Sequence, residues 1–383
     1  MVRLFLAFAM AGILLCAACP SAPIPFNPPD PDFSVAEVSD NTRRLMNYLI
    51  DQYGKYIISG QMDTSWTTNS TMDMIARVYA DTGKYPAIKG FDLIELPHSW
   101  GGFGREQIDE AIEWWEGRNR MDGANPAKQL LPDSPDIHGI VTFCWHWRVG
   151  SGLQFYTNRT DFRIPMKDGM LDTSSGDFAV IKADLDKVAA LFQLLKDRDI
   201  PVLWRPLHEA AGNWPNQPGW FWWGASGPEA CIALWEYMHN YLTYEKKLNN
   251  LIWVWNGQHK DWFPDPDTVD IVGFDVYAGS QNYASQLGKF IETSDMVPGQ
   301  NRIVAMTENG AFPDPDLCYK DGAMWSWFMT WNDRSGSVQG ETHRDNFWAG
   351  EYHNTQAHKE HVYNHGMVIT LDELPDLTKY RLE

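Results

Sequence analysis

The chain has 383 residues, a formal net charge of −19 at pH 7 and a hydrophobic fraction of 44%. This acidic balance argues against a nucleic-acid partner, because phosphate groups are bound mainly by Lys and Arg, and the apolar fraction is sufficient for one large core. Aromatic residues make up 14% of the chain, with 19 Trp among them. Indole rings pack in cores and also stack on sugar rings, and composition leaves both interpretations open.

Residues 1–19 resemble a bacterial lipoprotein signal. Arg3 precedes an apolar run over residues 4–15, which is too short to span a membrane. Cys19 follows the small residue Ala18, as a lipidated cysteine does, although Cys16 stands where Leu is usual. We expect export with a lipid anchor in a bacterial membrane, periplasmic or at the cell surface, as the only membrane contact. Plain cleavage and secretion are the alternative.

Residues 20–34 form a proline-rich linker, because six prolines lie between positions 20 and 32 and favour an extended chain. No second linker follows, so residues 35–383 are expected to form one catalytic domain. Cys144, Cys231 and Cys318 remain in this part of the chain. Their odd number and wide spacing favour buried thiols, although one pair could form a bridge in an oxidising compartment.

The body of the chain alternates short apolar strand patterns with longer helical patterns, such as residues 184–198 and 228–245. This alternation predicts a parallel sheet. Eight candidate strands indicate an α/β protein that forms a single (β/α)8 TIM barrel, in which chemistry takes place at the C-terminal ends of the strands. The candidate strands cover residues 56–61, 87–93, 139–146, 201–207, 251–255, 271–277, 303–308 and 325–331.

Two glutamates lie at such strand ends. Glu209 follows the fourth candidate strand and, if the strand continues, shares a face with Arg205; Glu308 ends the seventh. Glycoside hydrolysis requires a pair of carboxyl groups across the scissile bond, one as acid and one as nucleophile or base. For either glutamate the alternative is a buried ion pair, with Arg205 as a candidate partner.

Several motifs at fixed order make the assignment more specific. The chain carries RPLHE at 205–209, WFWWG at 220–224, WVWN at 253–256, GFDVY at 273–277 and TEN at 307–309. This set resembles the signature of glycoside hydrolase family 26. Members of that family are mostly β-mannanases with a (β/α)8 barrel and a retaining mechanism, and others cleave mixed-linkage β-glucan or β-1,3-xylan.

The resemblance implies roles for four residues around the scissile bond. Glu209 would be the general acid/base and Glu308 the nucleophile. Tyr277 would donate a hydrogen bond to the nucleophile, and Asp275 would lie beside it. The acid must hold its proton near neutral pH, which requires burial or a neighbouring negative charge to raise its pKa.

The resemblance also implies substrate contacts by two histidines and a tryptophan. His146 would line the −1 subsite, and His208 would touch the sugar or orient a carboxylate. The sugar platform would be Trp214 or Trp220, and we favour Trp220 because the residues after it match the motif. The segment 213–219 lengthens this loop relative to the family pattern and bears on substrate preference.

We therefore expect retaining hydrolysis of β-1,4-mannosidic linkages in mannan, galactomannan or glucomannan, a polysaccharide partner, no cofactor and no metal. The first alternative is the same mechanism on mixed-linkage β-glucan or xylan. The second is a non-catalytic glycan-binding lipoprotein at the cell surface. The third is a metal-dependent esterase built on the histidines at helical spacing, His358, His361 and His365.

Overall fold

The structure is a computed structural model in which part of the chain can be described. The predicted signal peptide, residues 1–19, and nearly all of the linker 20–34 lie outside that part. The loop at 97–104 also lies outside it. The described residues are 33–35, 37–63, 73–96, 105–117, 137–149, 152, 154–216, 219–334 and 337–383.

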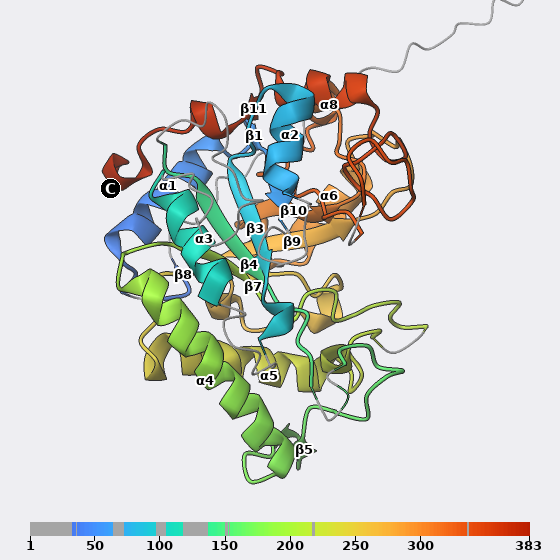
Figure 1. Ribbon diagram of the computed structural model, residues 1–383. Coiled ribbons are helices and arrows are strands. Elements are labelled where there is room, and N and C mark those ends of the chain that lie inside the picture. The colour runs from blue at the N-terminus through green and yellow to red at the C-terminus, as the bar shows by residue number, and fades with distance from the viewer. Residues whose placement is uncertain are drawn as a thin grey trace, which may run out of the picture.

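Seven parallel strands form one curled sheet in the order β10-β9-β8-β7-β4-β3-β2 (Figure 1). Each is short, fully buried and made mainly of apolar residues, as parallel strands covered on both faces are. Their positions confirm seven of the predicted strands to within a few residues. The strands are β2 (Gly60–Met62), β3 (Ile88–Asp92), β4 (Ile140–Cys144), β7 (Val202–Arg205), β8 (Leu251–Trp255), β9 (Ile271–Val276) and β10 (Ile303–Asn309).

The eighth predicted strand, residues 325–331, is not a regular strand, but it closes the barrel. Thr330 forms isolated parallel bridges with Gln61 at one sheet edge and with Asn309 at the other. Its backbone N–H donates to the carbonyl of Gly60 at 3.1 Å. Because this segment bonds both edge strands, the sheet is a closed (β/α)8 barrel, as predicted.

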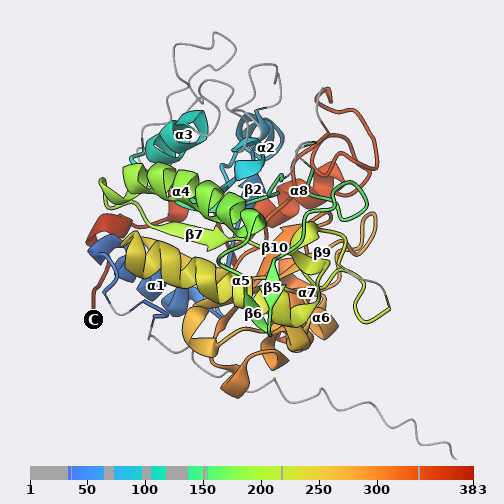
Figure 2. The ribbon, with the colours of Figure 1, turned by 90° about the horizontal axis from the view of Figure 1, so that it is seen from below.

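Helices surround the sheet, and Figure 2 shows α4 and α5 along one side of the barrel. Two smaller pairings complete the strands: β1 (Ile57–Ile58) with β11 (Val368–Ile369), and the hairpin β5 (Met166–Lys167) with β6 (Met170–Leu171). The α-helices are α1 (Asp40–Gln52), α2 (Met74–Thr82), α3 (Arg105–Trp115), α4 (Gly176–Lys196), α5 (Pro228–Asn240), α6 (Leu287–Asp295), α7 (Pro315–Asp321) and α8 (Gln356–Tyr363).

Single turns of helix occur in the loops, most of them 3₁₀ turns of three residues. The exception is η3 (Tyr241–Glu245), a π-helical turn that continues α5. The 3₁₀ turns are η1 (Leu93–Glu95), η2 (Trp222–Gly224), η4 (Lys260–Trp262), η5 (Pro266–Thr268), η6 (Pro298–Gln300), η7 (Leu371–Glu373) and η8 (Leu377–Lys379).

Local chemistry explains the bounds of the two helices predicted from periodicity. The predicted helix 184–198 begins earlier, at Gly176, because the Ser175 side chain accepts from the N–H of Phe178 and caps it. The predicted helix 228–245 is confirmed over α5, which starts with Pro228 in the position where a missing N–H costs least. Its last five residues form η3.

Most tryptophans belong to the core. Nine of the 19 are among the largest fully buried side chains, so packing accounts for them and composition alone does not indicate sugar binding. The cysteines Cys144, Cys231 and Cys318 are buried free thiols, as expected. Among the described residues, no helix is both long and apolar enough to cross a membrane. The nine are Trp145, Trp147, Trp204, Trp222, Trp223, Trp253, Trp262, Trp325 and Trp348.

Candidate active site

Glu209 reaches the barrel mouth from a turn. The predicted strand face through Arg205 and Glu209 is wrong, because β7 ends at Arg205 and the residues Leu207 and Glu209 have φ of 51° and 50°. Left-handed residues cannot continue a strand. The N–H of Glu209 donates to the carbonyl of Asn256 at 2.8 Å, which fixes the turn to the end of the neighbouring strand β8.

Glu308 lies in β10, where the pairing register with β9 shifts between Met306 and Glu308. This irregularity interrupts the simple alternation that predicted its direction, yet the side chain still reaches the mouth. Carboxyl oxygens of Glu209, Asp275 and Glu308 all lie within 4.8 Å of one another. Three strand ends therefore bring three carboxyl groups to one place.

Arg205 lies among these carboxyl groups. Its Nη1 donates to Asp275 Oδ2 at 3.0 Å and its Nη2 to Glu308 Oε1 at 2.5 Å, with all three side chains buried. The expected buried ion pair thus exists, but it involves Glu308 and Asp275 rather than Glu209. A buried guanidinium that bridges two carboxylates compensates their charge and fixes their orientation.

Glu308 and Asp275 are each held by further donors. The Tyr277 hydroxyl donates to Glu308 Oε2 at 2.7 Å. Asn256 and Thr307 donate to Asp275 Oδ1 at 2.6 and 2.8 Å. Burial, with Glu308 close by, raises the pKa of Asp275 although Arg205 opposes the rise. Both oxygens of Asp275 are occupied by protein groups, so its predicted substrate contact stays a prediction.

Glu209 has a different environment from Glu308. Its side chain is partly exposed, and among the described residues its one side-chain donor is Trp220, whose Nε1 lies 2.9 Å from Oε2. Burial, Asp275 and Glu308 together raise the pKa of Glu209 to about 9, and the Trp220 hydrogen bond opposes this rise. Glu209 is therefore suited to hold a proton while Glu308 carries compensated charge.

His146 and His208 contact each other beside the carboxyl groups. Their Nε2 atoms lie 3.3 Å apart, and His146 Nδ1 lies 2.6 Å from Asp92 Oδ2. Burial opposes protonation of His146, but Asp92 outweighs it and raises the pKa of His146. Burial and His146 lower the pKa of His208. A protonated His146 then donates to Asp92 through Nδ1 and to neutral His208 through Nε2.

A model of the glycosyl hydrolase family 26 matches residues 35–373, which is most of the chain. The chain belongs to glycosyl hydrolase family 26. This agrees with the resemblance seen in its motifs and with the barrel.

Curated relatives in the family carry mannanase names. The chain is 33% identical over 368 residues to a mannan endo-1,4-β-mannosidase of Thermothelomyces thermophilus, covering 93% of this chain and 66% of that protein. It is 30% identical over 338 residues to mannan endo-1,4-β-mannosidase B of Piromyces sp, covering 87% and 52%. The chain thus spans between half and two thirds of the length of these relatives.

Solved structures of the family have the same fold. The Podospora anserina GH26-CBM35 β-(1,4)-mannanase superposes with a TM-score of 0.74 at 30% identity, covering 94% of this chain and 72% of that one. A β-mannanase from a symbiotic protist of the termite Reticulitermes speratus, solved with a gluco-manno-oligosaccharide, gives 0.73 at 27% identity, covering 91% and 98%.

The two candidate platforms of this family 26 chain lie in different surroundings. Trp220 donates a hydrogen bond to Glu209, whereas Trp214 packs edge-on against buried Trp262 with ring centroids 5.9 Å apart. The loop that carries Trp220 approaches the chain after Glu209 closely, since a Cβ on Gly224 would overlap the carbonyl of Ala210. This close approach keeps Trp220 beside the carboxyl group.

Several residues of this site were not identified from the sequence. Asp92 ends β3 and Asn256 follows β8, so the rule that polar residues at strand ends matter would have found both. Trp331 lies at the end of the closing segment, with its ring centroid 5.5 Å from that of His146. Phe347 packs against Tyr277 at 5.4 Å, and no sequence signal marks it.

Three groups in the described residues bring possible metal ligands within 4.8 Å. The carboxyl cluster already contains the Arg205 guanidinium. The Asp92, Cys144 and His146 group is held together by the hydrogen bond between Asp92 and His146. The third group pairs His361 and His365 with Asp316 at the surface. His358, the remaining histidine of the predicted set, instead stacks on Tyr283 at 3.5 Å inside the fold.

Proposed function

We propose that residues 35–383 hydrolyse β-1,4-mannosidic linkages in mannan, galactomannan or glucomannan with retention of configuration. The observation that carries this proposal is the separation of at most 4.8 Å between carboxyl oxygens of Glu209 and Glu308 at the barrel mouth. Retaining glycosidases hold their two carboxyl groups about 5–5.5 Å apart, whereas inverting enzymes leave room for a water. The mannanase names of the relatives support the choice of substrate.

In the first step, protonated Glu209 donates its proton to the glycosidic oxygen while Glu308 attacks the anomeric carbon. The bond from the anomeric carbon to the leaving oxygen breaks as the bond to the Glu308 carboxylate forms. In the second step, the Glu209 carboxylate takes a proton from water. The water oxygen then attacks the anomeric carbon and releases Glu308, so the configuration is restored after two inversions.

The surrounding groups fit these roles. Burial of the hydroxyl and the neighbouring Glu308 raise the pKa of Tyr277, so Tyr277 stays a hydrogen-bond donor to the nucleophile. Arg205 donates to the other carboxylate oxygen of Glu308 and also to Asp275, so it fixes these two carboxyl groups relative to each other. In this proposal His146 and His208 line the −1 subsite, and Trp220 offers an indole face beside the acid.

The test is release of reducing ends from linear β-1,4-mannan, with xylan and lichenan in parallel. Glu209→Ala should lower activity on mannan by about 10²–10⁴-fold but largely retain cleavage of an aryl mannoside whose leaving group needs no proton. Glu308→Ala should abolish both reactions. NMR of the first product formed should show the β-anomer. First appearance of the α-anomer would refute retention.

The alternatives give different results in the same assay. Release from lichenan or xylan without release from mannan would keep the mechanism and exclude the proposed substrate. Binding of mannan without cleavage of any of the three would support the non-catalytic glycan-binding lipoprotein. Loss of an esterase activity on addition of chelator would support the metal-dependent alternative.

We also propose that residues 1–19 direct export and that Cys19 carries the lipid that anchors the enzyme to a bacterial membrane through the linker. The signal anatomy supports this, with Ala18 before the cysteine. Metabolic labelling with a radioactive fatty acid should label the full chain and not Cys19→Ala. Equal labelling of both would refute lipidation at this residue, and no labelling of either would favour plain secretion.

A further inference from the structure

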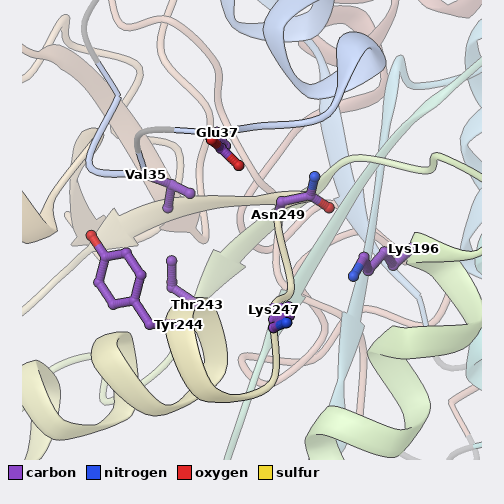
Figure 3. Close-up of a pocket in the computed structure, with 7 residues that line it drawn as sticks. All are labelled: Val35, Glu37, Lys196, Thr243, Tyr244, Lys247 and Asn249. Carbon is purple, nitrogen blue, oxygen red and sulfur yellow. The ribbon is translucent and has the colours of Figure 1, made fainter.

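Figure 3 shows a pocket of about 490 Å³. It lies at the opposite end of the barrel from Glu209 and Glu308. Its walls come from the segment before α1, the last turn of α4 and the π-helical turn η3. Of these elements, α4 leads into the N-terminal end of β7 and η3 into that of β8, whereas the carboxyl cluster lies past the C-terminal ends. The volume lies within the range of small-molecule pockets, about 300–1,000 Å³.

Two lysines without ion pairs line this pocket. Neither Lys196 nor Lys247 makes a salt bridge within the described part of the chain, although the chain as a whole carries a net charge of −19. The nearby Lys182 and Lys246 differ, because both pair with Asp186. Two unpaired ammonium groups at one cavity favour an anionic group in the ligand.

A buried hydroxyl without a partner points to a ligand independently. Thr243 is 5% exposed and lines the pocket, and no residue that the structure describes forms a hydrogen bond with its Oγ1. Helical threonines elsewhere in the chain donate to the carbonyl four residues earlier, as Thr82 and Thr293 do at 2.7 Å. In Figure 3 the Thr243 side chain projects from η3 toward Val35 across the pocket.

An aromatic ring forms another side of the pocket. Tyr244 is 55% exposed, and Figure 3 shows its ring beside Val35 at the edge of the cavity. Asn249 and Glu37 add an amide and a carboxylate that can bond sugar hydroxyls. A flat apolar face with polar groups around it suits a sugar ring better than a small inorganic ion.

We propose that this pocket is a second, non-catalytic saccharide site that takes a sugar bearing a carboxylate, a uronic acid residue. Lys196 and Lys247 bind the carboxylate, Thr243 and Asn249 bind hydroxyl groups, and Tyr244 covers one face of the ring. Such a site would bind the enzyme to an acidic polysaccharide while the active site at the other end of the barrel cleaves its own substrate.

The test is calorimetric titration of the full chain with trigalacturonic acid, mannotriose and sodium sulfate as separate probes. We expect trigalacturonic acid to bind, and Lys196→Met/Lys247→Met to weaken its binding about tenfold or more. Thr243→Val should weaken it severalfold without changing the charge. Lys167→Met/Lys320→Met removes two exposed lysines outside the pocket, so it is the matched charge control and should bind as the parent does.

Four outcomes would overturn the proposal. Absence of trigalacturonic acid binding, or binding that the pocket variants leave unchanged, would remove the site. Displacement by an equal concentration of sulfate would show a plain anion site. Equal weakening of mannotriose binding by the lysine variants would show a neutral glycan site. Hydrolysis of mannan is measured separately on the same variants and should not change, so failure here is distinct from failure of the proposed catalytic function.

Discussion

Trp220 Nε1 donates a hydrogen bond of 2.9 Å to Glu209 Oε2, so the loop after the fourth barrel strand turns back to the carboxyl group at its start. This hydrogen bond favours the charged form of Glu209 and limits the rise in its pKa caused by burial, Asp275 and Glu308. The residue that we propose as the sugar platform therefore also adjusts the pKa of the acid.

Trp220→Phe keeps an aromatic face and removes the donor. Loss of a hydrogen bond to the charged form raises the pKa of Glu209 further, so the alkaline limb of the profile of kcat/KM against pH should move to higher pH. The shift should be about one pH unit at most, since a hydrogen bond to a charged group contributes ~1.5 kcal/mol. Trp214→Phe is the control and should leave the limb in place. A limb that moves to lower pH would contradict this assignment.

Arg205→Met should destabilise the protein by about 3–5 kcal/mol at neutral pH, because it leaves Asp275 and Glu308 buried without their cation. Burial already raises the pKa of Asp275, and Arg205 counteracts it. In the variant Asp275 takes up a proton on folding, so the deficit should grow as pH rises from about 5 to 8. Urea unfolding at several pH values measures it.

Arg198→Met gives the matched control. Arg198 pairs with Glu116 at 2.9 Å while about half exposed, so its loss should cost no more than about 1 kcal/mol. A deficit of Arg205→Met that is as small, or that does not depend on pH, would show that Arg205 does not compensate the carboxyl cluster.

Asp92→Asn should lower the pKa of His146, because the carboxylate is what overcomes burial of this imidazole. The raised pKa of His146 in the folded protein contributes stability below its unfolded pKa of ~6.5, and this is lost as pH rises through the folded pKa. The parent should therefore exceed the variant in stability most at about pH 5–6, by roughly 1–3 kcal/mol.

NMR titration of the histidine ring protons measures this change directly. His239 serves as the internal control, since burial lowers its pKa to about 4 and Asp92 is not among the causes. An unchanged titration of His146 in Asp92→Asn would refute the proposed charge pair.

Gly60→Ala should destabilise the barrel where it closes. A Cβ at Gly60 would lie 2.6 Å from the carbonyl oxygen of Phe328 and 2.7 Å from Cε of Met329, so the closing segment would have to move. Overpacking of this kind costs ~1–3 kcal/mol. Gly288→Ala in α6 meets no atom within 4 Å and should be neutral or stabilise by up to ~1 kcal/mol, as thermal unfolding would show.

The parts predicted well from the sequence are those fixed by local patterns. Buried parallel strands are apolar runs between turn residues, so seven strands were located from the sequence. The two glutamates were then singled out because active-site residues of a TIM barrel lie at the C-terminal ends of its strands. The closing segment was assigned as a strand because it is equally apolar. Its irregular pairing depends on two neighbours, 58–62 and 304–309, which are distant in sequence.

The details of the site depend on contacts that no local pattern contains. The partners of Arg205 are Asp275 and Glu308, 70 and 103 residues away, rather than the nearby Glu209. The turn that carries Glu209 is set by its hydrogen bond to Asn256 on the next strand. For tryptophan, residue type alone did not separate the nine packed in the core from Trp220, because burial decides which indole remains available.

The bridges that residues 325–331 make on both sides have a consequence outside catalysis. Unpaired strand edges are templates on which another polypeptide can add, which is how many β-proteins begin to aggregate. Here the closing segment occupies the outer hydrogen-bonding groups of both β2 and β10, even without regular strand geometry. Disruption of this segment would therefore expose two self-associating edges at once, and the first sign of damage would be precipitation.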